Sequence, residues 1–268
     1  MKSYIDATHG VVANADAGSL VHRQLLDAER FAAFLQARPR YVSVRDALAG
    51  KGDALTIDDA TAAAADAARL ARRYGHEVTL FVNGYNVESG APYFFSRLAH
   101  ALDTAKAERI RFAGTDYPLT SHPAKLRFRR AVKETLARIG SEDARQELVA
   151  EIVRLAAGET TISPPLRALT LDELRELLDL GVELHNHGWT HVRVGALPPD
   201  EHAADIARGR EWLRRSLGCD SDIFAVPNGD GLPPWPSSPH YSIWLLLEDR
   251  WGYGEIAPAV YNRRTLWF

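Results

Sequence analysis

Short apolar runs rich in β-branched residues alternate along the chain with segments of helical spacing. Ala54-Leu55-Thr56-Ile57 and the run from His76 to Val82 predict two strands. Between them, an alanine-rich segment from Ala60 to Tyr74 predicts a helix that Gly75 ends. A strand, a helix and a second strand at this spacing indicate a right-handed βαβ unit with parallel strands. The pattern therefore favours an α/β fold.

The same alternation resumes after Pro164-Pro165. Thr170 followed by Glu173 matches a capping box and opens a helix that Gly181 ends. We expect the later elements to be a strand at 182–184, a helix from Pro198 to Leu217, strands at 223–227 and 243–247, and an irregular tail. Before residue 55 we expect a short strand at His9–Val12, a helix at Leu25–Leu35, and a strand or turn at 41–44.

The middle of the chain, from about Tyr93 to Gly158, reads as a helical insertion within one domain that spans residues 1–268. Apolar residues recur there at helical spacing, while basic residues occupy the outward positions; the outward residues are Arg127, Arg129, Arg130 and Lys133. Such a basic face could contact an anionic partner. We interpret it as a solvated surface, which is the usual role of a charged helix face.

Composition excludes several classes of protein. The 268 residues are 46% hydrophobic and carry 32 basic and 35 acidic residues, so no overall field favours nucleic acid. Cys219 is the only cysteine, which excludes an internal disulfide and a CxxC zinc site. The start lacks the apolar core of a signal peptide, and no apolar run is long enough to span a membrane. We expect a soluble cytoplasmic protein of unspecified oligomeric state.

Three of the ten histidines fall within the stretch from His185 to His191, directly after a predicted strand. His187 and His191 are four residues apart, a spacing that allows both imidazoles to reach one metal ion. Asn186, Gly188 and Thr190 are poor helix formers, so we expect a structured loop rather than a helix. A catalytic metal needs a third protein ligand.

The pair Asp58-Asp59 is the strong candidate for that ligand, because it ends a predicted strand. In α/β folds, ligands gather at the carboxyl ends of the strands. Adjacent strand residues face opposite sides, so both carboxylates can serve one site only if the strand has already broken into a turn. Seen alone, either carboxylate could instead simply cap the following helix.

Three motifs together resemble those of the polysaccharide deacetylase (NodB-homology) family of carbohydrate esterases. Thr56-Ile57-Asp58-Asp59-Ala60 is similar to its TFDDG signature, and Gly181 to His191 is similar to its second, histidine-containing motif. Phe224-Ala225-Val226-Pro227-Asn228-Gly229-Asp230 stands where the family has Phe-Arg-x-Pro-Tyr-Gly or Phe-Ala-Tyr-Pro-x-Gly-Asp. Their order and spacing agree over most of the chain.

The resemblance implies a distorted (β/α) barrel of about seven strands and a divalent metal, usually zinc. On that pattern Asp59, His187 and His191 hold the metal, and Asp58 is the general base. The resemblance also implies that the backbone N–H at Asn228 helps to stabilise the tetrahedral oxyanion.

Several residues depart from the family pattern. Ala225 replaces an arginine that pairs with the base in many members, so Arg263 or Arg264 from the tail is expected to set the pKa of Asp58. Ala60 replaces a glycine, which excludes a turn that needs an easy positive φ at this residue. The general acid stays unassigned, because His240 lies in a different context.

The remaining histidines have less specific interpretations. His185 could line the cleft or be a packed histidine. His9 and His22 are most simply surface or core-edge residues, and a position near a site stays open for His9.

The sequence favours a metal-dependent N-deacetylase that acts on an N-acetylated sugar, nucleoside or glycolipid precursor. Two alternatives stay open: hydrolysis of another amide on the same fold, and a catalytically silent carbohydrate-binding domain. The presence of the base Asp58 beside all three ligands favours activity, because a silent domain does not need the base.

Overall fold

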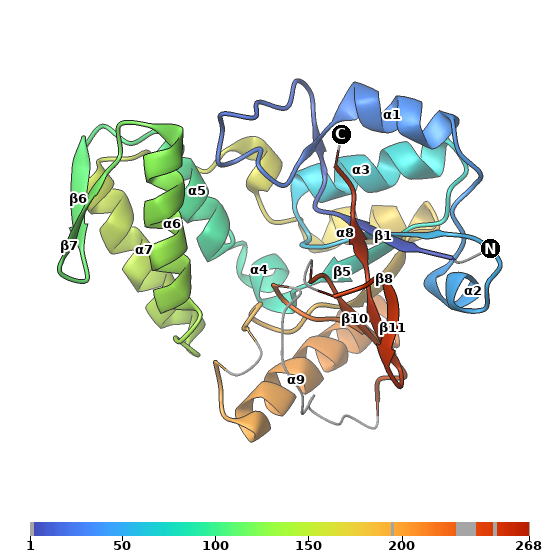
Figure 1. Ribbon diagram of the computed structural model, residues 1–268. Coiled ribbons are helices and arrows are strands. Elements are labelled where there is room, and N and C mark those ends of the chain that lie inside the picture. Colours follow the sequence, from blue (N-terminus) through green and yellow to red (C-terminus); the bar gives the residue numbers. More distant parts are fainter. Residues whose placement is uncertain (1–2, 194–195, 229–239, 249–250, 268) are drawn as a thin grey trace.

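A parallel sheet forms the centre of the protein. The structure is a computed structural model, and it describes residues 3–193, 196–228, 240–248 and 251–267 (Figure 1). Six strands are parallel neighbours in the order β10, β9, β8, β5, β4, β1. Their bounds are β1 Ile5–Thr8, β4 Ala54–Ile57, β5 Thr79–Val82, β8 Glu183–Asn186, β9 Ile223–Ala225 and β10 Ile243–Leu246.

The last segment of the chain closes this sheet into a barrel. β12 (Val260–Asn262) pairs in parallel with β10, and β13 (Arg264–Thr265) pairs in parallel with β1. Because β12 and β13 are separated only by Arg263, one segment bridges both edges of the six-stranded sheet. The expected distorted barrel of about seven strands is thereby confirmed.

The expectation of an irregular tail was wrong. β11 (Gly254–Ala257) runs antiparallel to β12 at the margin of the sheet, and the tail supplies three strands in all among the described residues. Asn262-Arg263-Arg264 has no apolar residue, because each of these side chains binds a polar partner in the folded protein. Tertiary pairing across the barrel gap makes this segment a strand.

Alternate strand residues separate the barrel interior from the outer core. On β5, Phe81 belongs to a cluster with residues of β1, β4, β9 and β10, whereas Leu80 and Val82 pack outward against helices. This alternation follows from the two-residue period of a strand. Thr56 continues the inner face of Ala54 on β4, so the next inward position is Asp58.

Helices cover the outside of the barrel, with α1 and α3 above it and α9 below it in Figure 1. Their bounds are α1 Ala28–Gln36, α2 Val44–Leu48, α3 Ala62–Arg73, α8 Leu171–Asp179 and α9 Pro199–Leu217, with a 3-10 turn at Pro164–Leu166. The capping box predicted at Thr170 and Glu173 is present at the start of α8. The predicted parallel unit β4–α3–β5 is also present.

The segment predicted as a helical insertion stands to one side of the barrel (green, left of Figure 1). After α4 (Gly84–Ser89) it contains α5 Phe94–Asp103, α6 His122–Leu136 and α7 Glu142–Ala156 around a second apolar core, to which the N-terminal segment also contributes Leu20, Val21 and Leu25. It also contains an antiparallel hairpin, β6 Arg109–Phe112 and β7 Thr115–Pro118, which the sequence analysis did not predict. Ala113 and Gly114 both have positive φ, as a tight hairpin turn requires.

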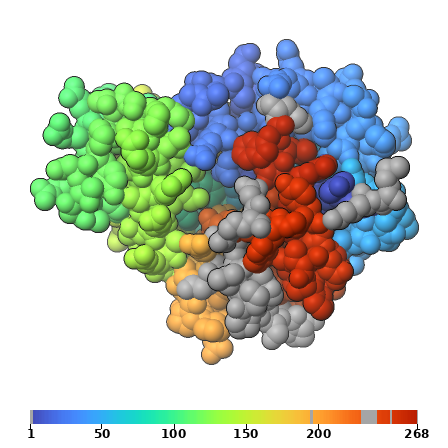
Figure 2. All heavy atoms as spheres, viewed as in Figure 1, coloured from blue at the N-terminus to red at the C-terminus, as the bar shows by residue number. Residues whose placement is uncertain are grey.

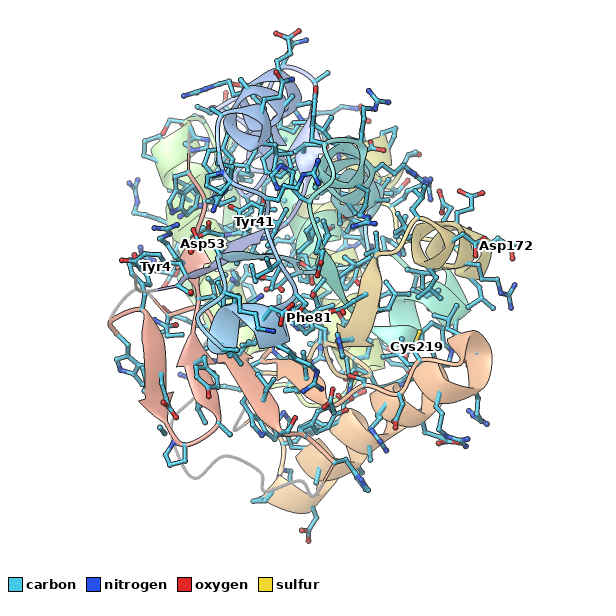
Figure 3. All side chains as sticks on the ribbon, turned by 90° about the vertical axis from the view of Figure 1, so that its right-hand side faces the viewer. Tyr4, Tyr41, Asp53, Phe81, Asp172 and Cys219 are labelled. Atoms are coloured by element: carbon cyan, nitrogen blue, oxygen red, sulfur yellow. The ribbon has the colours of Figure 1, made fainter. Side chains whose placement is uncertain are left out.

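The first barrel strand begins earlier than expected. The predicted strand at His9–Val12 corresponds only to β2 (Val11–Val12), which pairs with β3 (Leu26–Asp27) outside the barrel. β1 contains the fully buried Asp6, and a buried carboxylate disguises a strand in a hydropathy pattern. Arg264 and Tyr41 donate hydrogen bonds of 2.7 Å to Asp6. Figure 3 shows Tyr41 close to Tyr4 and Asp53 at this end of β1.

Among the described residues, no helix is both long and apolar enough to cross a membrane.

Candidate active site

The two adjacent carboxylates can face the same site because they lie in the turn between the end of β4 and the start of α3. β4 stops at Ile57, and Asp59 adopts a left-handed backbone with φ of 61°. The turn that two convergent carboxylates require is therefore present, and the positive φ falls on Asp59 rather than on Ala60. Aspartate tolerates this conformation better than most residues do. Thr61 caps α3 by accepting a hydrogen bond from the amide N–H of Ala64, so neither aspartate is needed as its cap.

The part of the stretch from His187 to His191 forms a loop after β8, as predicted, whereas His185 and Asn186 belong to the strand itself. The ring Nδ1 of His187 lies 2.8 Å from the carbonyl oxygen of Ala225 and can only donate to it. This contact leaves the lone pair of Nε2 available, and Nε2 lies 3.7 Å from Oδ1 of Asp59. His191 has a positive φ of 52° and brings its Nε2 to 3.4 Å from the same oxygen.

These three residues fit a divalent metal ion. One ligand atom from each of Asp59, His187 and His191 lies within 4.8 Å of the others, and all three residues are buried. Oδ1 of Asp59 is buried without a hydrogen-bond partner among the described residues. Two imidazoles and one carboxylate are a donor set that zinc accepts, with positions left for water or substrate. A buried carboxylate oxygen without a partner is otherwise costly.

The loop that holds both histidines is fixed from several sides. Asn83, after β5, donates from Nδ2 to the carbonyl oxygens of His187 and Gly188. The carboxylate of Asp205 on α9 accepts three hydrogen bonds from the loop. The donors are the backbone N–H of Trp189, the backbone N–H of Thr190 and the hydroxyl group of Thr190. The loop position is therefore set by neighbouring elements and not by the metal alone.

The insertion also contacts this loop. Arg145 on α7 is only 2% exposed and donates from Nη2 to the carbonyl oxygen of Thr190 at 2.9 Å. Its guanidinium is paired with the carboxylate of Glu142 one turn earlier. A buried ion pair of the insertion thus fixes the backbone next to His191.

Arg263 pairs with Asp58, which in many family members is paired with an arginine at the position of Ala225. Its guanidinium forms two hydrogen bonds with Asp58, of 2.6 Å from Nη1 and 2.7 Å from Nη2. Further bonds to Thr56 and to the carbonyl oxygen of Leu246 fix the guanidinium in the barrel interior. Of the two tail arginines considered from the sequence, Arg263 binds Asp58, whereas Arg264 binds Asp6 on the other side of the strand.

The environments of the two aspartates shift their pKa values in opposite directions. Burial alone would raise the pKa of Asp58, but the charges of Arg263 and His187 and the bonds from Arg263 hold it well below its usual value. Burial and then the charge of Asp58 raise the pKa of Asp59 well above its usual value. A cation beside Asp59 would favour its ionised form and so lower this raised pKa, which is the effect that a bound metal ion has on a carboxylate ligand.

A cavity of about 240 Å³ opens above these groups. Asp58, Asp59, His187, His191 and Asn228 all line it, so the five residues predicted from the sequence converge on one cavity. Asn228 has a φ of 63°, which makes it the third residue of this group with a left-handed backbone. Left-handed non-glycine residues often cluster at functional sites.

His9 also lines this cavity, so of the two positions considered for it the one near a site holds, and not the surface or core-edge one. Burial lowers its pKa to about 4. His185 is instead a packed histidine, because its ring lies against Phe81 and its Nδ1 lies 3.3 Å from the hydroxyl of Ser221. Neither His22 nor His240 is among the residues that line the cavity.

Several residues that line the cavity were not predicted as site residues, and three of them are cations: Arg23, Arg129 and Lys133. Trp267, whose side chain is 64% exposed, also lines the cavity and was not singled out. The basic pattern at 127–133 was the available signal, but a charged helix face is usually solvated. Only the position of the insertion beside the barrel brings these cations to the site.

Comparisons with known proteins agree with this arrangement. The sequence profile of the family described as polysaccharide deacetylase matches residues 47–234. No curated protein matches the sequence significantly.

Several solved structures share the fold over nearly the whole chain. Streptococcus pyogenes deacetylase PplD in complex with acetate aligns at a TM-score of 0.59 and 13% identity, covering 99% of this chain and 92% of its own. IcaB from Ammonifex degensii aligns at a TM-score of 0.52 and 16% identity, covering 98% and 87%. A de-N-acetylase from Aggregatibacter actinomycetemcomitans aligns at 0.54 and 15% identity, covering 98% and 94%. At such identities the likeness establishes the fold.

Proposed function

Because this chain belongs to the polysaccharide deacetylase family, we propose that it is a metal-dependent hydrolase that removes an N-acetyl group from an amino sugar or a related N-acetylated molecule. One observation carries the proposal. An aspartate held as a carboxylate by Arg263 lies in the same cavity as a buried Asp-His-His donor set. A base beside a metal site is what hydrolysis of an amide by water requires.

Asp59, His187 and His191 would hold the metal, for which zinc is the best fit to two imidazoles and one carboxylate. A bound zinc ion would supply Lewis acidity, which lowers the pKa of water and polarises a carbonyl group. The hydrogen bond from His187 to Ala225 would keep the Nε2 lone pair directed at the ion.

Asp58 would accept the proton of the attacking water with one of its carboxylate oxygens. Arg263 would hold that carboxylate in place and ionised before the reaction. The backbone N–H of Asn228 would donate a hydrogen bond to the developing oxyanion. The leaving nitrogen must take up a proton as its bond to the acetyl carbon breaks, and the proton accepted by Asp58 balances that uptake. His9 lines the same cavity.

The walls of the cavity suit a sugar ring. Trp267 presents a large, exposed aromatic face at its margin, and Gln24 and Thr265 contribute polar groups. An amphipathic ligand with hydroxyl groups and an apolar ring face would match both kinds of wall.

The test is metal analysis combined with acetate release from a panel of N-acetylated sugars. We expect the wild-type protein to bind about one zinc ion and to release acetate. Asp58→Asn should keep its zinc but lose about 100- to 10,000-fold in kcat, because it removes the base alone. Asp59→Ala should lose both zinc and activity. Absence of metal and of acetate release from every substrate would contradict the proposal, and full activity of Asp58→Asn would contradict the role of Asp58.

A further inference from the structure

Basic side chains of the insertion line the cavity beside the proposed metal site. On α6, the residues Ala124, Phe128, Val132 and Leu136 are buried in the core of the insertion. Arg129 follows Phe128 and Lys133 follows Val132, so the two cations lie four residues apart on the neighbouring side of the helix. Both line the cavity that contains Asp58 and Asp59. Two like charges four residues apart destabilise a helix. The stability of α6 therefore does not explain why Arg129 and Lys133 occupy these positions.

The guanidinium of Arg129 lies in an unusual environment. Its Nε is buried and has no hydrogen-bond partner among the described residues. Burial and the nearby charge of Arg23 lower its pKa to about 10. The carboxylate of Asp103 is also close, but it already accepts hydrogen bonds from Ser19, Leu20 and Val21. Arg129 is therefore a poorly neutralised cation at the cavity wall.

Arg23 approaches from the N-terminal segment. Its side chain is exposed, and within the described part of the chain no carboxylate forms an ion pair with it. Two guanidinium groups from segments more than 100 residues apart thus face one cavity without a shared counter-ion. Such a pair repels itself until an anion lies between its members.

The positive charge continues outward from the site. An adjoining cavity of about 460 Å³ shares Arg23, Arg129, Lys133 and Asn228 with the first one. Its described lining also includes Arg127, Arg130 and Arg193, against the single carboxylate of Glu134. In Figure 2, the N-terminal segment (blue), the insertion (green) and the C-terminal segment (red) surround a recess on the face shown.

This charge is a local feature. The whole chain carries a formal net charge of −3, so the cations gather here against the overall balance. Inside the first cavity, Asp58 is already neutralised by Arg263, and Asp59 faces the donor set of the metal. Neither carboxylate is available to Arg23 or Arg129. A cleft of one sign attracts ligands of the opposite sign.

We propose that this cleft, lined by Arg23, Arg129 and Lys133, binds a phosphate group of the substrate, so that the enzyme acts on a phosphorylated N-acetylated amino sugar. The inference rests on the proposed deacetylase function and specifies its substrate class. Guanidinium groups form bidentate hydrogen bonds with phosphate oxygens. Arg23 and Arg129 would hold the phosphate while the acetamide lies at the metal site.

A phosphate fits this charge distribution better than the carboxylate of a uronic acid. A carboxylate carries one charge and is satisfied by one guanidinium, as Arg263 satisfies Asp58. A phosphate ester carries up to two charges on three oxygens and can use both arginines and the lysine. The adjoining cleft with its further arginines leaves room for a second phosphate or a group attached through the phosphate.

The test compares kcat/KM for acetate release by the zinc-loaded protein from four probes. These are N-acetylglucosamine, its 1-phosphate, its uridine diphosphate derivative, and N-acetylmuramic acid, which carries a carboxylate. We expect at least one phosphorylated probe to be preferred over N-acetylglucosamine by about tenfold or more, since a charge-assisted hydrogen bond contributes on that order. The two phosphorylated probes distinguish a monoester from a diphosphate.

Variants assign the preference to the cleft. Arg23→Gln and Arg129→Gln should each lower kcat/KM for the preferred phosphorylated probe about tenfold more than for N-acetylglucosamine. Arg23 is exposed, so its variant keeps the test valid if Arg129→Gln fails to fold. Arg138→Gln is the matched control, because Arg138 is an exposed arginine just after α6 that lines neither cavity. It should behave like the wild type.

Binding measurements separate this inference from the proposed function. Calorimetric titration of Asp58→Asn with the phosphorylated probes reports affinity without turnover. One outcome is that Asp58→Asn binds a phosphorylated probe, that adding Arg23→Gln weakens this binding, and that the wild type releases acetate from no probe. This outcome would support the phosphate site and overturn the deacetylase proposal. Equal kcat/KM for neutral and phosphorylated probes, an equal or greater preference for N-acetylmuramic acid, or unchanged preference in both arginine variants would overturn the phosphate site.

Discussion

Asp58 and Asp59 are neighbours with the same side chain, and their partners make them chemically different. Asp58 receives two hydrogen bonds from a fully buried guanidinium, which keeps it ionised in the barrel interior. Asp59 is turned toward the two imidazoles by its left-handed backbone. Two carboxylates in environments that separate their pKa values commonly mark a division of roles in catalysis.

The pair of Asp58 and Arg263 should contribute to stability as well as to activity. Arg263→Met leaves a buried carboxylate without its cation, and we expect the free energy of unfolding to fall by about 3 kcal/mol in urea denaturation. Acetate release should fall as well, because Asp58 loses its position.

A double-mutant cycle tests the coupling between these two residues. The variant Asp58→Asn combined with Arg263→Met should be less destabilised than the sum of the two single changes. A loss below about 0.5 kcal/mol for Arg263→Met, which is usual for an exposed residue, would show that the pair is not important for folding.

At the scale of elements, the loops that follow the barrel strands carry the candidate site residues, and the flanking helices fix the loop after β8. α9 contributes Asp205 to the backbone of Trp189 and Thr190, and α7 contributes Arg145 to the carbonyl oxygen of Thr190. Gly209 on α9 allows the close approach, because a Cβ there would lie 2.4 Å from Oδ1 of Asn186. The helix and the loop after β8 are thus packed backbone to backbone.

Removing the carboxylate of Asp205 should therefore weaken metal binding without touching a ligand. We expect Asp205→Ala to reduce zinc affinity about tenfold, as is usual for groups that orient metal ligands. Competition with a chromogenic chelator measures this affinity. Asp200→Ala, at an exposed position in the first turn of the same helix, is the matched control. Equal zinc affinity in both variants would mean that the loop does not need Asp205.

At the scale of the whole molecule, one chain end meets the other. The strand pair of β12 and β13 fills the gap between β10 and β1, and Arg264 reaches Asp6 across it. The insertion stands beside this barrel and supplies the cationic wall of the cavity. Stability, pocket shape and charge therefore depend on contacts between distant parts of the sequence.

The stability of the whole molecule should fall as the pH drops below about 6.5, in part through His76. His76 is buried, accepts a hydrogen bond from the amide N–H of Tyr41 through Nδ1, and its Nε2 lies 3.0 Å from the carbonyl oxygen of Leu35. The neutral imidazole satisfies both contacts, and burial lowers the pKa of His76. The unfolded chain binds this proton more readily, so acid favours unfolding.

Comparison with a neutral analogue isolates this contribution. Glutamine can accept and donate at similar positions but does not titrate, so His76→Gln should have a shallower loss of unfolding free energy between pH 7 and 5 than the wild type. Urea denaturation at several pH values measures the slope. Identical slopes would show that other groups account for the acid sensitivity.

The local sequence was enough to single out Asp58, Asp59, His187 and His191 as candidates, and the family resemblance supplied the roles expected of them. Asp58-Asp59 and the segment from His187 to His191 each follow a strand, and parallel strands bring their carboxyl ends to one edge. The parallel βαβ unit and the capping box at Thr170 were visible in local residue patterns, whereas the barrel was expected from the family resemblance. The chemical roles of these residues stay predictions.

Only the tertiary structure decided which arginine faces Asp58, where His9 lies, and that Arg23 and Arg129 meet at the cavity. Arg263 and Asp58 are 205 residues apart, and adjacent arginines in a strand point to opposite sides, so the sequence could not choose between Arg263 and Arg264. The strands of the tail and the charge of the cleft have the same cause. Both depend on packing between segments that are distant in the sequence, and a local pattern of polar and apolar residues does not encode such contacts.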